Sequence, residues 1–180
     1  SQLAGQIRAE LADLNFLETN FDLEVTESAP LSANGFDEAC FLISMNPGSP
    51  MRMLGDVASG GELSRIMLAI KTVLADKDQT ETLIFDEIDV GISGRTAQKV
   101  SEKMAVIARS RQVLCITHLA QIASMADHHF YIEKNVHDGI TETSIRELSL
   151  MESEEELARI LGGDQITETI LSSAKEMKQK

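Results

Sequence analysis

The chain has 180 residues, an apolar fraction of 43% and a formal net charge of −13. This length fits one domain with a sizeable core, and the core must be aliphatic because aromatic residues make up only 4% of the chain. An acidic surface repels phosphate backbones, and the scattered lysines and arginines form no basic patch, so this segment is not expected to grip DNA. No apolar run is long enough to span a membrane, so no membrane partner is expected.

The first 45 residues predict a helix followed by two strands. Leu3, Ile7 and Leu11 share one helical face within residues 1–15, which indicates either a free-standing amphipathic helix or the end of a coiled coil. Residues 21–27 alternate as a half-buried strand does, and residues 39–45 form a second apolar strand-like run. Proline, serine and Asn-Gly between these two runs predict a turn.

The middle of the chain alternates between helices and strands. Apolar residues at helical spacing begin after Glu62, and a second helical stripe runs from Ala97 to Ile107. Two short apolar runs without alternation, residues 82–87 and 112–117, predict strands that are buried on both faces. This order favours an α/β fold with a parallel sheet core flanked by helices.

The last third adds antiparallel and helical segments. A short helix is expected at 119–125, and "HHFYIEK" and "ITETSIREL" predict a β pair across the "HDG" turn. In the next helix, Ser153 and Glu156 have capping-box spacing and two glycines follow. A final helix is expected at about 166–178.

Both cysteines, Cys40 and Cys115, lie in apolar strand-like runs, which predicts buried, reduced thiols in a cytosolic protein. No Cys/His spacing resembles a zinc site.

Three polar residues stand where the predicted parallel strands end. Asp86 and Glu87 follow "TLIF", and His118 follows "VLCIT". Ligands of open parallel sheets bind beyond the carboxyl ends of the strands, so these side chains are expected at one edge. Asp86 could support Mg²⁺, Glu87 could activate a water, and His118 could bond a terminal phosphate. Each alone could equally be a cap or a packing residue.

Gly60 and Gly61 directly precede the helix that starts near Glu62, within the stretch "DVASGGELSR". Glycine lets the backbone approach another body closely, and a helix start presents unpaired N–H groups. The pair therefore indicates an anion site, although a glycine-rich helix entry is the simpler structural alternative.

Four motifs, in order and at matching spacing, resemble the SMC-like branch of the ABC-type ATPases. "ASGGELSR" is similar to their signature motif and "TLIFDE" to their Walker B strand, while "DVGISG" and "ITHLAQIA" resemble their D-loop and switch-histidine segment. The wording, with the late "LARILGG", resembles bacterial members that act in DNA double-strand-break repair and recombination. The phosphate-binding pattern G-x-x-x-x-G-K-[ST] does not occur in the chain.

The resemblance implies a composite ATP site formed by two heads. Asp86 would support Mg²⁺ through water, and Glu87 and His118 would be catalytic. The groups acting in trans, on ATP held by the partner head, would be Ser59, Gly60, Gly61, Glu62, Asp89 and Ser93.

The resemblance also implies the organisation of the chain. Residues 1–15 would be the end of a coiled-coil helix, and residues 16–180 the C-terminal lobe of an ATPase head that lacks the Walker A motif. Its partners would be the N-terminal Walker A lobe of the same protein, a second head in a homodimer, and DNA bound chiefly by the full-length protein. The expected location is the bacterial cytoplasm, near the nucleoid.

Without a P-loop, these 180 residues alone are expected to hydrolyse no ATP, because phosphoryl transfer depends on a complete set of positioned groups. Two alternatives stay open: a head lobe from another SMC-like chromosome-structure protein, and a dimerisation scaffold that hydrolyses nothing.

Overall fold

The computed structural model describes residues 1–180 apart from positions 34, 57–59, 76, 138–139, 164 and 180. The chain divides into two compact units, residues 1–116 and residues 117–180, and each is described by itself. No helix in the described ranges is long and apolar enough to cross a membrane.

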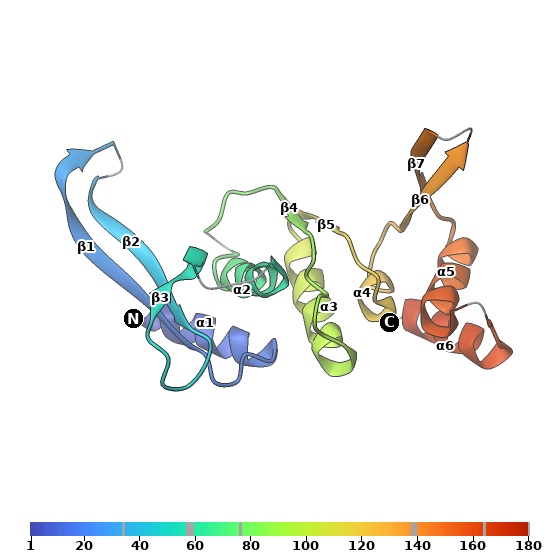
Figure 1. The fold of residues 1–180 in the computed structure, drawn as a ribbon, viewed down its shortest axis with the longest axis horizontal. Coiled ribbons are helices and arrows are strands. Elements are labelled where there is room, and N and C mark those ends of the chain that lie inside the picture. Colours follow the sequence, from blue (N-terminus) through green and yellow to red (C-terminus); the bar gives the residue numbers. More distant parts are fainter. Residues whose placement is uncertain (34, 57–59, 76, 138–139, 164, 180) are drawn as a thin grey trace. The chain divides into compact units, whose positions relative to one another are not determined.

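The first unit begins with a helix seated on a β-hairpin (Figure 1). Helix α1 (Gln2–Asp13) has Ser1 as its N-cap, and the Ser1 side chain accepts the Ala4 N–H. Ala4, Ile7 and Leu11 are buried, and Leu3 is half-buried. Strand β1 (Asn20–Ser32) pairs antiparallel with β2 (Gly35–Ser44), and the short β3 (Arg52–Met53) extends this sheet. The predicted helix and strands are confirmed, although both strands run further into the predicted turn.

The predicted parallel core is confirmed in the same unit. A 3-10 turn at Leu54–Asp56 leads towards α2 (Gly60–Val73), and β4 (Thr82–Phe85), α3 (Gly94–Ala108) and β5 (Gln112–Cys115) follow. Strands β4 and β5 pair in parallel from Thr82↔Gln112 to Phe85↔Cys115. Helix α3 connects the two strands and buries Ala97, Val100 and Ile107. Because the strands are parallel, their carboxyl ends lie at the same edge of the sheet.

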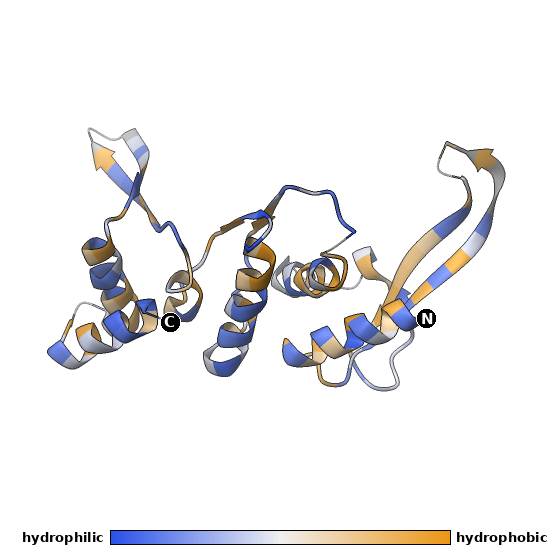
Figure 2. Cartoon of the chain, turned by 180° about the vertical axis from the view of Figure 1, so that it is seen from behind, coloured by the Kyte–Doolittle hydropathy of each residue, from blue (hydrophilic) through white to orange (hydrophobic). Residues whose placement is uncertain are grey.

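Strands β4 and β5 were expected to be buried on both faces, and this expectation is wrong for the unit as described. Leu83 and Phe85 are buried on one face, but Ile84 is 68%, Leu114 45% and Ile116 55% exposed. Both strands are coloured largely as apolar in Figure 2. A parallel sheet is normally covered on both sides, so this two-stranded sheet presents an uncovered apolar face.

The second unit contains a hairpin and three helices. Their bounds are α4 (Ala120–Ala123), β6 (Phe130–His137), β7 (Ile140–Glu147), α5 (Leu150–Gly162) and α6 (Glu168–Lys178). Strands β6 and β7 are antiparallel, as predicted, with Ile132 opposite Ile145. The helices pack around a small aliphatic core that includes Leu157, Ala158 and Ala174.

The predicted capping box at Ser153 and Glu156 is wrong, because the helix starts one turn earlier. Ser149 is the N-cap of α5, and it forms a capping box with Glu152, whose carboxylate accepts the Ser149 N–H at 2.9 Å. Ser153 is instead buried inside the helix, where its hydroxyl contacts His129 Nδ1 at 2.8 Å. Both serines have a glutamate three residues later, so spacing alone could not distinguish them.

The two cysteines are free thiols, as predicted, but they are half-buried rather than fully buried. Cys115 is the last residue of β5, and Cys40 lies in the middle of β2, opposite Glu24.

Candidate functional site

The turn that follows β4 carries an acidic pair in an unusual backbone conformation. Asp86 and Glu87 are both exposed, and Asp86 Oδ1 accepts the Glu87 N–H at 2.9 Å. Glu87 has a φ of 58°, in the left-handed region that residues other than glycine rarely adopt. Such a conformation persists only where surrounding contacts impose it, and it occurs preferentially at functional sites.

The contacts that impose it come from the first turn of α2. A Cβ placed on Gly60 would lie 2.0 Å from Glu87 Oε2, and a Cβ on Gly61 would lie 2.7 Å from the Glu87 carbonyl oxygen. The Gly61 Cβ would also lie 3.0 Å from the Cβ of Val90. The two glycines therefore allow the start of α2 to lie directly on the turn of the same chain.

Ser64 and Arg65, one turn further along α2, stabilise this contact. The Ser64 hydroxyl donates to the Asp86 carbonyl oxygen at 2.7 Å. Arg65 Nη1 donates to the carbonyl oxygens of Ile88 at 3.2 Å and Val90 at 2.8 Å. The predicted signature helix and the predicted Walker B turn are thus one bonded assembly within one chain.

Arg65 was not identified as a site residue from the sequence. In the structure it is buried, with only 7% of its surface exposed. Burial lowers the pKa of its guanidinium, and the charges of Glu62 and Asp89 oppose this shift. A charged residue on the otherwise apolar face of α2 was the available signal, because a buried charge requires partners.

The predicted seam residues continue along the same turn. Asp89 is buried, with 4% of its surface exposed, whereas Ser93 occupies the N-cap position of α3 without a side-chain capping bond. Gly91 and Gly94 have φ values of 76° and 50°, so the backbone turns sharply between Asp89 and α3. Ser59 lies outside the described residues.

Negative charge gathers at this edge of the sheet. The pKa of the Cys115 thiol is raised to about 12, chiefly by burial and further by the charges of Asp89 and Asp86. No cluster of three or more His, Cys, Asp or Glu side chains that could hold a metal occurs among the described residues. Mg²⁺ commonly takes only one or two protein carboxylates and completes its shell with water and phosphate oxygens, so Asp86 stays a predicted magnesium ligand.

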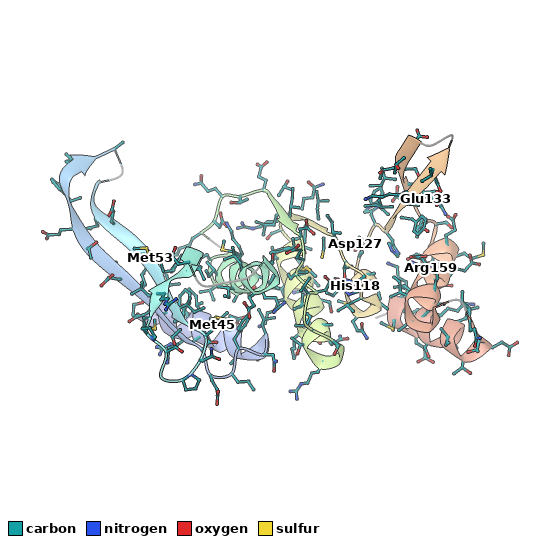
Figure 3. The ribbon with its side chains drawn as sticks, viewed as in Figure 1. Met45, Met53, His118, Asp127, Glu133 and Arg159 are labelled. Atoms are coloured by element: carbon teal, nitrogen blue, oxygen red, sulfur yellow. The ribbon has the colours of Figure 1, made fainter. Side chains whose placement is uncertain are left out.

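His118 belongs to the second unit, where it precedes α4 and is exposed (Figure 3). Its predicted approach to Asp86 and Glu87 therefore stays a prediction. The structure brings together Asp86, Glu87, Gly60, Gly61 and Asp89 in the first unit.

No family model matches the chain. The DNA repair protein RecN of Bacillus subtilis is 42% identical over 98% of this chain, and that of Vibrio cholerae is 46% identical over 98%. The chain spans about a third of the length of these relatives, 33% and 32% respectively.

A solved Smc head domain with a coiled coil and joint from Pyrococcus yayanosii has a similar fold. It aligns with a TM-score of 0.58 and 19% identity over 86% of this chain and 28% of that one. This likeness shows that the chain has the fold of an SMC head domain. The chain is therefore similar to RecN proteins along nearly all of its own length, and its fold is that of an SMC-type head.

Proposed function

We propose that this chain is the C-terminal lobe of an SMC-like ATPase head that acts in DNA double-strand-break repair and recombination. The longer protein that carries it would work through ATP-dependent head dimerisation and ATP hydrolysis. The observation that carries the proposal is the docking of the Gly60–Gly61 helix start on the Asp86–Glu87 turn. This contact joins the residues proposed for catalysis to those proposed for head pairing.

The two carboxylates of the turn have roles that fit their positions, and His118 of the second unit has a role that rests on the motif resemblance. Asp86, exposed at the end of β4, would help to hold Mg²⁺, which neutralises phosphate charge when bound. Glu87 would orient and deprotonate the attacking water, and its imposed φ would hold the carboxylate ready without rearrangement. His118 would hydrogen-bond the γ-phosphate.

The start of α2 would act on the nucleotide of the partner head. The backbone N–H groups at Gly60, Gly61 and Glu62, with the Ser59 hydroxyl, would receive the γ-phosphate, because a helix N-terminus favours an anion. The backbone from Asp89 to Ser93 would line the seam and connect the two nucleotides. The Ser93 hydroxyl makes no capping bond and is available for such a contact.

The uncovered face of the β4–β5 sheet supports an N-terminal Walker A lobe as partner. Ile84, Leu114 and Ile116 leave an apolar surface that a complete α/β head would cover. Relatives about three times as long have ample chain for such a lobe. Residues 1–15 would then be the end of the coiled-coil helix that connects the lobes.

The full-length protein would act in the bacterial cytoplasm. Other parts of it would bind DNA, because a net charge of −13 disfavours contact between this chain and phosphates. The RecN relatives are 42% and 46% identical, against 19% for the Smc head, and this difference favours a repair protein over a chromosome-structure protein. A scaffold without hydrolysis is the remaining alternative, and it would not need the conformation imposed on Glu87.

The test is ATP hydrolysis by the 180-residue chain, alone and mixed with a separately expressed N-terminal lobe that carries the P-loop. We expect no activity from the chain alone and activity after mixing. Hydrolysis by the chain alone would contradict the half-site, since a phosphate-binding loop would then exist within it. A mixture that binds ATP and dimerises without hydrolysing it would favour the scaffold.

Glu87→Gln in the full-length protein tests the proposed general base. The amide keeps the size of the side chain but cannot accept the proton, so ATP binding should persist, the closed dimer should accumulate, and turnover should fall by about a hundredfold or more. Unchanged turnover would remove Glu87 from this role. Ser173→Ala, at an exposed position on α6, controls for the effects of mutagenesis and purification and should keep the wild-type rate of ATP turnover.

A further inference from the structure

We propose that Arg65 is a positioning residue that ties the signature helix to the catalytic turn of its own chain. The turn would therefore respond when that helix engages the partner's nucleotide. The second part rests on the function proposed above. The first part rests only on contacts within the first unit.

Arg65 bonds the turn at two points. Its Nη1 donates to the carbonyl oxygens of Ile88 and Val90, at 3.2 Å and 2.8 Å, and these residues flank Asp89. The carbonyl of Glu87 accepts the Val90 N–H at 3.0 Å, so the bonded segment includes the residue with the imposed φ. One guanidinium thus fixes the backbone on the C-terminal side of the catalytic carboxylate.

A third contact joins the end of α1 to the same side chain. The guanidinium lies over the ring of Phe16, 5.6 Å from its centroid. Phe16 is held to α1 by its N–H, which donates to the Leu11 carbonyl oxygen at 3.0 Å. Arg65, which belongs to α2, therefore contacts two other segments: the turn and the residue Phe16 after α1.

Stability alone does not explain a charge at this position. The side chain is 7% exposed, and Nε has no hydrogen-bond partner among the described groups. An apolar residue of similar volume often replaces a buried charge at no net cost, so a buried charge is weak support for a purely stabilising role. Donors directed at two backbone carbonyls instead restrict the position of the turn, and an apolar side chain cannot do this.

The experiment uses mixed dimers of the full-length protein, purified with different tags on the two subunits. One subunit carries Arg65→Met and the other carries Glu87→Gln. The competent ATP site then takes Glu87 from the first subunit and an unaltered signature helix from the second. A loss at this site measures the effect of Arg65 on its own turn, separately from any effect across the dimer.

The reference is a dimer of wild-type and Glu87→Gln subunits. We expect Arg65→Met to lower kcat at the competent site about tenfold, with KM for ATP changed less than about twofold, because the groups that act in the transition state are misplaced. Arg65→Lys should recover part of kcat, since an ammonium can still donate to both carbonyls. Arg109→Met, at an exposed arginine that ends α3, should match the reference.

Amide hydrogen exchange of the nucleotide-free full-length protein provides a measurement that does not depend on ATP. Arg65→Met should speed exchange at Val90 and Ile92, whose N–H groups bond within the turn, and leave β6–β7 unchanged. If Arg65→Met does not fold, Phe16→Leu replaces it, because this change removes only the ring beneath the guanidinium and should speed exchange at the same amides.

The outcomes separate the two proposals. An inactive wild-type protein with faster exchange in the variant would reject the ATPase and retain Arg65 as the residue that positions the turn. An active protein in which the mixed dimer has the reference rate and exchange is unchanged would overturn the Arg65 proposal alone. Faster amide exchange in the variant, together with ATP turnover equal to that of the reference dimer, would overturn the proposed link between Arg65 and catalysis.

Discussion

Gly61→Ala tests whether α2 really lies against the catalytic turn. A methyl group at Gly61 would lie 2.7 Å from the Glu87 carbonyl oxygen and 3.0 Å from the Val90 Cβ. Since backbone cannot rotate away as a side chain can, the helix start or the turn must shift. Overpacking of this kind costs about 1–3 kcal/mol, against a gain of roughly 0.5–1 kcal/mol from replacing a helical glycine by alanine.

Gly5→Ala in α1 is the matched control. It is the same substitution in a helix, at an exposed position where no atom lies within 4 Å of the added methyl. It should stabilise the chain by roughly 0.5–1 kcal/mol. Both variants gain a similar helix stabilisation from replacing glycine by alanine, so this gain nearly cancels when they are compared. The free energy of unfolding of Gly61→Ala should therefore be lower than that of Gly5→Ala by the overpacking cost, about 1–3 kcal/mol.

Urea unfolding of the chain at 25 °C, followed by circular dichroism, gives the comparison. Gly60→Ala completes the set, because its methyl would meet only the end of the Glu87 side chain, which can swing away. This variant should have near wild-type stability but reduced ATP turnover in the full-length protein. Equal stabilisation by Gly61→Ala and Gly5→Ala would refute the close approach.

Two further predictions concern other contacts. Lys103→Met removes the cation that α3 provides to Glu10 and Asp13 of α1, and this pairing lowers the pKa of Asp13. Losing the pairing should lower the free energy of unfolding in urea by about 1–3 kcal/mol. The control is Lys99→Met, which removes a more exposed pair with Glu102 and should lower it by less than about 0.5 kcal/mol. Equal costs would show that the α1–α3 contact adds nothing. In the second unit, burial lowers the pKa of His129 below its ordinary 6.5, helped by Lys178 and opposed by Glu156. The folded state therefore binds a proton at His129 less readily than the unfolded state, and the free energy of unfolding should fall as the pH drops from 7.5 to 5. In His129→Gln the free energy of unfolding should depend less on pH. An unchanged pH dependence in this variant would assign the effect to another group.

Local patterns in the sequence predicted the elements that carry the site. Helical spacing located α2 and α3, and short apolar runs located β4 and β5 with the acidic pair at the end of β4. These predictions succeeded because periodicity and strand length reflect burial along a few consecutive residues. The order of the four motifs also led to the SMC-like head, which the fold comparison supports.

Local patterns failed where the answer depended on a distant partner. The capping box was placed one turn late because Ser149 and Ser153 have equivalent spacing, and only the packing of Ser153 against His129 distinguishes them. The exposed face of β4 was missed because an apolar run does not reveal whether its cover lies within the chain.

The sequence by itself determined which residues stand at the site: the glycine pair before a helix and the carboxylates after a strand. Only the tertiary structure decided that these segments touch within one chain. Ser64 and Arg65 reach partners 22 to 25 residues away, and the same approach imposes the left-handed conformation on Glu87. No pattern confined to neighbouring residues encodes such a distance, because it is set by how α2 and β4 pack together.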